Sequence, residues 1–189
     1  MVMMAEPLEQ AISHIRTQRN DLAPVVLFSP IGKRLDHAAV QRWASSSGAI
    51  LMCGRYEGID QRFIDTHVDE QISLGDFVLS GGEIAAMALL DAVARLQPGV
   101  LSDPDSHHMD SFNPALDGLL DCPHYTRPEV WAGLRVPDVL LSGHHGQIEC
   151  WRREQRLLWT ALHRPDLLDV ARKAGRLTPQ DEVVLKRAR

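Results

Sequence analysis

The sequence has few cysteines, and their arrangement suits neither a disulfide framework nor a metal centre. Cys53, Cys122 and Cys150 are an odd number at wide spacing, and no CxxC pair occurs. A disulfide-stapled secreted domain or a zinc domain would show a denser and more regular pattern. We therefore expect reduced thiols, as in a cytosolic protein.

A membrane anchor and an overall basic character are also missing. No signal peptide is visible, and no apolar run reaches the roughly 18 residues of a membrane-spanning helix. The formal net charge is −5, whereas nucleic-acid-binding domains are usually basic. Arginine and lysine do gather between Arg152 and Arg189, which fits either a phosphate-binding face or a solvated helical surface. We expect a cytoplasmic protein that makes no membrane contact.

The common nucleotide-binding and nucleophile motifs are absent. The chain contains no GxxxxGK[ST] loop, no GxGxxG after a strand, and no GxSxG around Ser80 or Ser142. These absences disfavour a P-loop enzyme, a usual dinucleotide-binding domain and an α/β-hydrolase. The adjacent pairs His107-His108 and His144-His145 suggest polar loops more than metal ligands, because neighbouring side chains diverge.

The 189 residues contain apolar runs that alternate with helical patterns in the first half of the chain. Such alternation is typical of an α/β fold with a mainly parallel sheet. The predicted strands are Val25–Phe28, Ala49–Cys53, Gln71–Leu74 and Phe77–Leu79. The predicted helices begin near Pro7 and then cover His37–Ser46, Gln61–His67 and Glu83–Ala94, with Asp36 and Asp60 as N-caps.

The segment Gly75 to Pro98 reads as a strand, a glycine turn and a helix. Gly81-Gly82 provides the turn, and Ile84 to Ala94 is apolar on almost every side. A helix of this kind is buried, either inside the domain or against a second subunit. Ligands of open α/β sheets bind at the carboxyl ends of strands, so a site is expected here, although an ordinary core βα unit has the same pattern. The other loops expected at strand ends are Ser29-Pro30, Gly54–Asp60 and Ser73–Phe77.

The second half of the chain begins with a long polar loop. Ser102 to Gly118 has no helical or strand period and contains Asp105 and Asp110. A carboxylate from this loop, together with Arg95, would suit proton removal from a nitrogen nucleophile, whereas a salt bridge is the simpler reading. After a further strand near Val139–Leu141, the chain reads as helical, with Ile148–His163 and helices after Pro165 and Thr178.

Four motifs together resemble one known family. They are CGRYEGID at Cys53–Asp60, SLGDFVLSGGE at Ser73–Glu83, LLDCPHYTRPE at Leu119–Glu129 and VPDVLLSGHH at Val136–His145. In order and over essentially the whole chain, they are similar to the bacterial tRNA (guanine-N1)-methyltransferases (TrmD) of the SPOUT class. The resemblance implies a parallel α/β sheet with a deep trefoil knot, a small helical C-terminal domain, and a homodimer with the active site at its interface. It also implies methyl transfer from S-adenosylmethionine to N1 of the guanosine 3′ to the anticodon of tRNA.

The resemblance also implies domain limits and site residues. Residues 1–101 would form the methyltransferase domain, 102–118 an interdomain loop and 119–189 a tRNA-binding domain, with tRNA phosphates held by the basic helices. Asp110 would be the general base that removes the N1 proton, and Arg95 would stabilise the negative charge on guanine O6. Glu57 would serve a Mg²⁺ ion. The methyl donor would lie against Ser29, Pro30, Gly54, Tyr56, Ser73, Leu74, Gly75, Asp76, Phe77, Val78, Leu79 and Gly81.

One departure from the family concerns the start of the chain. Family members carry a strand, a helix and a glycine-rich loop ahead of the segment that matches Met1, so roughly sixty residues are missing, a large loss for a domain core. We expect a misassigned start. One alternative is a truncated, non-catalytic protein that retains the donor pocket or the tRNA surface. Another is an unrelated α/β nucleotide-binding enzyme, which the missing phosphate-binding motifs disfavour.

Overall fold

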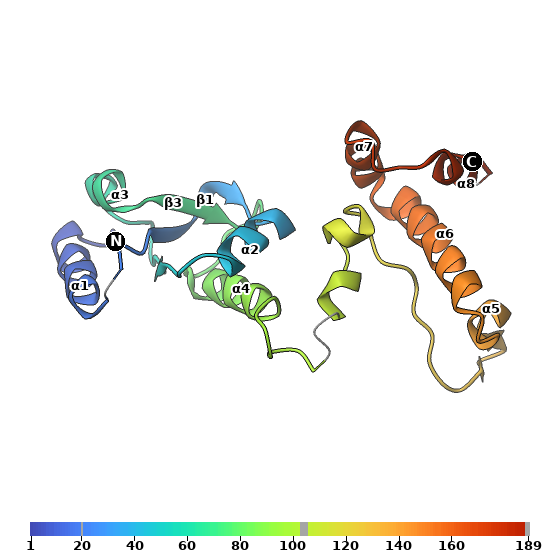
Figure 1. The fold of residues 1–189 in the computed structure, drawn as a ribbon. Coiled ribbons are helices and arrows are strands. Elements are labelled where there is room, and N and C mark those ends of the chain that lie inside the picture. The colour runs from blue at the N-terminus through green and yellow to red at the C-terminus, as the bar shows by residue number, and fades with distance from the viewer. Residues whose placement is uncertain (20, 103–105, 188–189) are drawn as a thin grey trace. The chain divides into compact units, whose positions relative to one another are not determined.

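The computed structural model describes residues 1–19, 21–102 and 106–187. It divides into two compact units, Met1–Ser102 and Asp103–Arg189, called here the N-terminal and C-terminal units (Figure 1). Asp105 and Arg189, which the sequence analysis singled out, lie outside the described residues. None of the described helices is both long and apolar enough to cross a bilayer.

The N-terminal unit is built on a parallel sheet, which confirms the predicted α/β class. Its three strands lie in the order β2-β1-β3, and β1 pairs in parallel with both neighbours. The strands are β1 (Val25–Arg34), β2 (Ile50–Met52) and β3 (Glu70–Ser73). The helices are α1 (Ala5–Gln18), α2 (His37–Ala44), α3 (Gln61–His67) and α4 (Glu83–Ala94).

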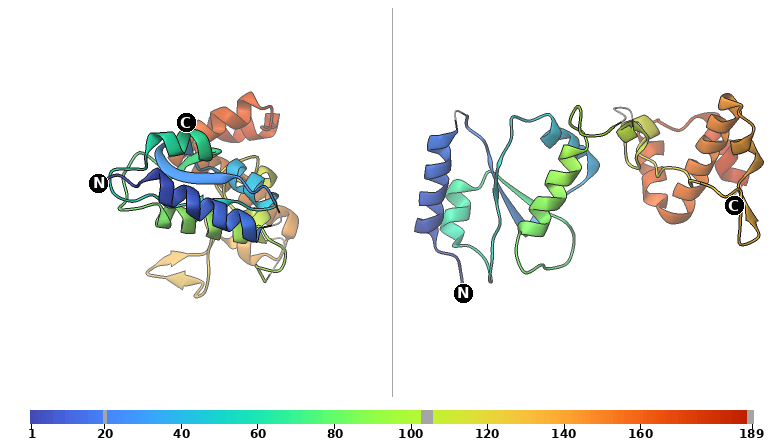
Figure 2. Two further views of the ribbon diagram at one scale, coloured as in Figure 1. Left: turned by 90° about the vertical axis from the view of Figure 1, so that its left-hand side faces the viewer. Right: turned by 90° about the horizontal axis from the view of Figure 1, so that it is seen from below.

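Helices cover both faces of this sheet (Figures 1 and 2). Side chains alternate along β1, as they must in a strand. Val25 and Leu27 join the buried cluster formed with α1 and α3, whereas Val26 and Phe28 join the one formed with α2 and α4. This two-sided burial explains why the strand reads as a continuous apolar run in the sequence.

The end of β1 differs from its prediction. The strand was expected to stop at Phe28, but it continues to Arg34. Both Phe28 and Lys33 pair with Ile72 of β3, so the pairing skips residues 29–32, which bulge out of the ladder. Gly32 returns the chain to the ladder so closely that a Cβ there would lie 2.5 Å from the backbone nitrogen of Ile72.

The strand predicted at Phe77–Leu79 is wrong. These residues form an irregular loop between β3 and α4, and all three side chains remain exposed. Helix α4 itself forms as predicted, and Ala85, Ala86 and Leu89 are its buried residues. The expectation that its apolar surface is buried all round is not met within the unit, because a stripe of large residues lies open: Ile84, Met87 and Leu90.

The C-terminal unit is mainly helical, as expected. The helices are α5 (Asp138–Leu141), α6 (His145–His163), α7 (Pro165–Lys173) and α8 (Pro179–Arg187). A short hairpin precedes them, made of β4 (Val130–Trp131) and β5 (Leu134–Arg135). The core joins the loop before the hairpin to the last three helices through Leu119, Leu157, Leu168, Ala171 and Leu185.

Two predictions for this unit need correction. The apolar run at Val139–Leu141 lies in helix α5 and not in a strand, because a short apolar run has no period that separates the two. The polar segment before Gly118 is not a structureless loop. It contains two 3-10 turns, η1 (Ser106–Met109) and η2 (Pro114–Leu116), and it buries Asn113 and Leu116.

The predicted helix caps are confirmed. The side chains of Asp36 and Asp60 accept hydrogen bonds from Ala39 and Arg62 backbone N–H groups. Thr178 and Asp181 form a reciprocal pair, in which the Thr178 hydroxyl accepts from the Asp181 N–H and the Asp181 carboxylate accepts from the Thr178 N–H. Such pairs satisfy N–H groups that have no partner inside the helix.

Candidate functional site

A cavity of the N-terminal unit lies where the three parallel strands end. Its volume is about 350 Å³, within the ordinary range of small-molecule sites. The β1 bulge, the loop after β2 and the loop between β3 and α4 all contribute to its wall. This is the edge at which open parallel sheets bind ligands.

The wall of this cavity is built from backbone brought close together by glycines. A Cβ on Gly82 would lie 2.8 Å from the Cα of Cys53, and one on Gly81 would collide with the Glu83 carboxylate. The N–H of Gly82 donates to the carbonyl of Gly54, which joins two of the loops. Gly75 has a φ of 159°, which few other residues adopt, and exchanges hydrogen bonds with the Ser73 side chain. Larger residues at these places would close or deform the cavity.

Nearly all of the residues predicted to hold the methyl donor line this cavity. Asp76 is the exception, because its carboxylate points to Arg34, with which it forms an exposed ion pair at 3.0 Å. The lining residues among those predicted are Ser29, Pro30, Gly54, Tyr56, Ser73, Leu74, Gly75, Phe77, Val78, Leu79 and Gly81. The structure thus gathers residues from three separate segments of the sequence.

An ion pair joins the cavity wall to helix α4. Arg55, which lines the cavity, contacts Glu83 at the start of α4 at 2.8 Å. A hydrogen bond from its own backbone N–H and one from Arg55 lower the pKa of Glu83. Sequence reasoning placed Glu83 at the helix start but did not find Arg55 as its partner.

Glu57 lines the same cavity, but it belongs to no group of three metal-ligating side chains among the described residues. Its exposed carboxylate pairs with the amino group of Met1. Within the described residues, three ligand atoms come close enough to hold a metal ion at Asp121, Cys122 and His124, and Glu57 is not one of them. The residues around Glu57 therefore do not fit a protein-built Mg²⁺ site, although Mg²⁺ often relies on one carboxylate with water and phosphate.

The two predicted catalytic residues belong to different units. Arg95 is the C-cap of α4 in the N-terminal unit, and Asp110 follows η1 in the C-terminal unit. Both residues have contacts within the protein.

Asn113 fixes the turn that carries Asp110. Its backbone N–H donates to the Asp110 carbonyl, and its side-chain amide donates to the carbonyl of His107. Its side-chain oxygen accepts from the N–H of Ala115, and the residue is only 4% exposed. Phe112, which directly precedes Asn113, adopts a φ of 71°, which is uncommon for an aromatic residue. This one amide thus joins both ends of the turn.

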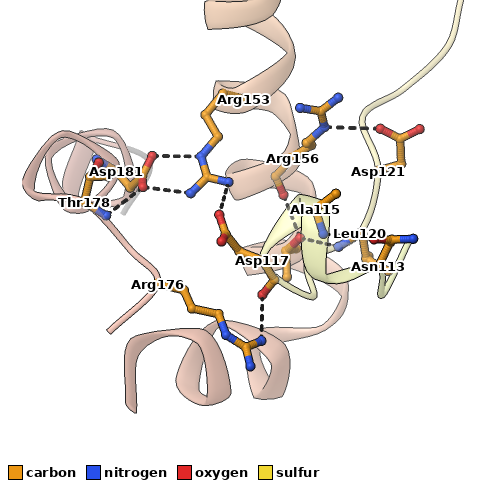
Figure 3. Close-up of polar contacts among 11 residues, drawn as sticks. Asn113, Ala115, Asp117, Leu120, Asp121, Arg153, Arg156, Arg176, Thr178 and Asp181 are labelled. Atoms are coloured by element: carbon orange, nitrogen blue, oxygen red, sulfur yellow. Dashed lines mark hydrogen bonds and ion pairs between the residues drawn. The ribbon is translucent and has the colours of Figure 1, made fainter. Parts of the chain in front are cut away.

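A network of charged side chains ties this turn to the helices (Figure 3). Arg153 of α6 forms two hydrogen bonds to Asp181 of α8, at 3.0 and 2.8 Å, and one to Asp117 at 2.8 Å. Arg176 donates to the Asp117 carbonyl. Burial raises the pKa of Asp181, but the hydrogen bonds from Arg153 and Thr178 outweigh it, so the net shift is downward.

Many of the arginines in the predicted basic segment are paired with carboxylates. Arg152 contacts Glu149, Arg156 contacts Asp121, Arg164 contacts Asp166, and Arg172 contacts Glu182. Within the described part of the chain, the cations of this segment with no ion pair to a carboxylate are Lys173, Arg176, Lys186 and Arg187, and Arg176 donates to the backbone carbonyl of Asp117. The charge available to phosphate is therefore smaller than composition suggests.

A further polar cluster was missed by sequence reasoning. Asp121, Cys122 and His124 lie within one motif, and their ligand atoms lie within 4.8 Å of one another. Asp121 accepts from His124 at 2.8 Å and from the buried Arg156 at 3.2 Å. The short spacing of these residues was visible in the sequence, but Arg156 comes from α6 and only folding brings it there.

The comparisons with known proteins agree on one family. The family model described as tRNA (Guanine-1)-methyltransferase TrmD matches residues 1–170. A tRNA (guanine-N(1)-)-methyltransferase of Albidiferax ferrireducens is 72% identical over 185 residues, which cover 98% of this chain and 75% of the relative. Those of Paracidovorax citrulli and Bordetella pertussis are 69% and 58% identical, over 98% and 96% of this chain and 74% and 72% of their own lengths. The chain belongs to the tRNA (guanine-1)-methyltransferase TrmD family.

Proposed function

We propose that this member of the family transfers a methyl group from S-adenosylmethionine to N1 of the guanosine 3′ to the anticodon of tRNA. The relatives named above are tRNA (guanine-N(1)-)-methyltransferases at up to 72% identity. The observation that carries the proposal is the cavity at the strand ends, whose wall contains the motifs that the chain shares with its family. A tRNA methyltransferase needs such a site for its methyl donor.

The cavity suits the bent adenosyl donor. Backbone groups around Gly54, Leu74 and Gly81 offer donors and acceptors to an adenine ring and a ribose, while Phe77 and Leu79 offer apolar contact. The close approach of backbone that Gly81 and Gly82 permit leaves space that a side chain would fill. When bound, the donor supplies an electrophilic methyl group. Pro30, Tyr56, Ser73 and the other lining residues bind and orient it.

The remaining chemistry concerns one proton and one negative charge. Guanine N1 is a poor nucleophile until it loses its proton, and the resulting charge lies largely on O6. We assign proton removal to the carboxylate of Asp110 and stabilisation of the O6 charge to the guanidinium of Arg95. Asn113 supports this assignment because it holds the Asp110 turn from both ends.

The two units take different parts in this proposal. Residues 1–101 form the methyltransferase domain with the family's deep trefoil knot, residues 102–118 connect the domains, and residues 119–189 bind tRNA in the cytoplasm. The unpaired cations Lys173, Lys186 and Arg187 are available for phosphate. No step is assigned to a metal ion, because Glu57 belongs to no group of three protein ligands within the described residues.

The enzyme acts as a homodimer with the active site at its interface. Support comes from the open apolar stripe of α4, where Ile84, Met87 and Leu90 are each more than half exposed. The apolar residues Phe77 and Val78 at the cavity are also exposed. Contiguous exposed apolar surface of this kind marks an interaction site.

The decisive test is labelled-methyl transfer to an unmodified tRNA transcript with guanosine after the anticodon. Asp110→Asn removes the proton acceptor and keeps the shape, so kcat should fall by about 10²- to 10⁴-fold. Binding of S-adenosylmethionine, measured by calorimetry, should stay unchanged. Asp138→Asn is the matched control, since Asp138 is an exposed carboxylate paired with Arg135, and it should transfer at the wild-type rate.

Two outcomes would contradict the proposal. If Asp110→Asn transfers the methyl group at the wild-type rate, Asp110 is not the general base. If the wild-type protein binds the methyl donor and tRNA but transfers no methyl group, the non-catalytic alternative is favoured. The 189-residue chain should be assayed beside a form extended to the length of its relatives. Inactivity of the extended form as well would then count against the proposed reaction itself. Sedimentation of both forms tests the dimer.

A further inference from the structure

A second cavity lies wholly inside the C-terminal unit. Its volume is about 210 Å³, and it lies between the segment after Asp121 and helices α5 and α6. The lining residues are Cys122, Pro123, His124, Tyr125, Leu140, Ile148, Trp151 and Arg152. It shares no residue with the donor cavity, and the proposed methyl transfer makes no use of it.

We propose that this cavity binds one unpaired nucleobase of the RNA substrate. The inference rests on the proposed function, because it takes the substrate to be RNA. It adds a binding site that the transfer reaction itself does not require. The argument rests on the size of the cavity, its aromatic residues, and the polar groups fixed at its edge.

The size of the cavity suits a single ring system. It is smaller than the roughly 300–1,000 Å³ of sites that hold a whole cofactor or drug-sized ligand. It is much larger than one water, whose share of liquid volume is about 30 Å³. A nucleobase, with its sugar and phosphate left outside in solvent, fits between these limits.

Two aromatic rings provide stacking surface. The ring centroids of Tyr125 and Trp151 are 6.2 Å apart and the rings are tilted by 58°, so neither ring covers the face of the other. Tyr125 is 49% exposed, which is a large open surface for an aromatic side chain beside a cavity. Proteins recognise unpaired RNA bases by stacking them on such side chains.

Polar groups at the edge are held in fixed orientation. The Nε2 atom of His124 bonds to the Asp121 carboxylate at 2.8 Å, which leaves Nδ1 for a ligand. Asp121 is held in turn by the Cys122 N–H at 2.7 Å and by Arg156 at 3.2 Å. A fixed imidazole can pair with the polar edge of a base, and the tautomer is set by the carboxylate.

Arg152 adds a cation to the same wall. It forms an ion pair with Glu149 through Nη1 at 2.8 Å, so other N–H groups of the guanidinium can reach a phosphate. A base in the cavity with its phosphate beside Arg152 would use both the apolar and the charged parts of the wall.

A metal ion at Asp121, Cys122 and His124 is the less favourable reading of this corner. The guanidinium of Arg156 already bonds to Asp121, and a second cation would be repelled. Burial raises the pKa of the Cys122 thiol, which opposes the thiolate form that metals bind. Both observations favour a role in which Asp121 fixes the orientation of the His124 ring.

The test uses the full chain and an anticodon stem–loop RNA that carries 2-aminopurine at one loop position at a time. Binding should quench the fluorescence at one position, where the base stacks in the cavity. Tyr125→Ala should abolish that quenching and weaken binding about 5- to 150-fold, the loss expected for one stacked base. Tyr125→Phe keeps the ring and should restore most of the affinity. Leu22→Ala is the control, because Leu22 is 95% exposed in the N-terminal unit and lines neither cavity.

The results separate this inference from the proposed function. Unchanged affinity and quenching in Tyr125→Ala would overturn the base site, as would a wild-type chain that shows no quenching at any loop position. Methyl transfer to whole tRNA is measured independently, and its result tests the proposed methyltransferase function without testing the base site. Amide hydrogen exchange in α6 and α8, which pack in the core of the same unit, shows that the C-terminal unit of each variant has folded.

Discussion

The N-terminal unit brings the walls of its cavity together through glycines, whereas the C-terminal unit joins its parts through charged side chains. Beside the cavity at the strand ends, Gly32 and Gly82 let backbone segments approach within distances that no Cβ allows. At the end of η2, one arginine, Arg153, joins Asp117 to Asp181 and so connects three parts of the C-terminal unit. The first arrangement is sensitive to volume and the second to charge. The two units should therefore fail under different substitutions.

The largest effect is expected for Gly32→Ala in the N-terminal unit. The new Cβ would lie 2.5–2.6 Å from the backbone of Gln71 and Ile72, which cannot move without breaking the β1–β3 pairing. We expect the N-terminal unit to lose about 3 kcal/mol of unfolding free energy. Amide hydrogen exchange should report this loss in the sheet and leave the protection of α6 unchanged.

Gly146→Ala is the matched control for volume. Gly146 lies in the first turn of α6, and nothing lies within 4 Å of an added Cβ. The substitution should stabilise the C-terminal unit by up to about 1 kcal/mol, because alanine favours helix more than glycine does. Equal destabilisation by both substitutions would show that the contrast between the units is false.

The second effect in size is expected for Arg153→Met. The substitution keeps the length of the side chain but leaves the Asp181 carboxylate, only 6% exposed, without its cation. Removing one partner of a fully buried pair costs roughly 3–5 kcal/mol. Arg153 is 28% exposed, so we expect about 2 kcal/mol, measured by urea unfolding of the C-terminal unit.

Arg62→Met is the comparison from the N-terminal unit. Arg62 pairs with Asp60 at 2.6 Å, but its side chain is 87% exposed. Exposed ion pairs contribute less than about 1 kcal/mol, so unfolding should change little. If Arg62→Met costs as much as Arg153→Met, burial is not what gives the C-terminal network its strength.

The smallest effect is expected from acid. The pKa of Asp181 and that of Asp121 lie below the ordinary 3.8 in the folded protein, since hydrogen bonds to their charged forms outweigh burial. Their contribution to stability is thus complete above pH 3.8 and is lost as the pH falls below it toward the folded-state pKa. Urea midpoints of the C-terminal unit should fall across this window, and Asp181→Asn should flatten the dependence. A C-terminal unit whose midpoint stays constant there would contradict the assignment.

Local sequence signals predicted most of the helices and their limits. Asp36 and Asp60 cap the helices that they were expected to cap, because an Asx side chain acts on N–H groups only two or three residues away. The apolar run Val25–Phe28 revealed a strand buried on both faces. Most of the residues that the motifs predicted for the methyl donor line one cavity, although they come from three segments.

The sequence could not decide features that depend on distant partners. Phe77–Leu79 has the composition of a strand, but strand identity needs a neighbour to pair with, and the segment turns aside to line the cavity instead. Val139–Leu141 was misread for a different reason, since three apolar residues in a row have no measurable period. The bulge after Phe28 also depends on β3, which pairs with β1 in two registers.

The sequence by itself determined the family, the α/β class, the capped helices of the N-terminal unit and most of the residues that line the cavity at the strand ends. These follow from motifs and from interactions between residues close along the chain. Only the tertiary structure decided that Arg153 joins Asp117 to Asp181, that Arg156 supports Asp121, and that Tyr125 and Trp151 line one cavity. Charges and rings tens of residues apart meet because the hydrophobic core fixes where their helices lie, and no local pattern in the chain records that placement.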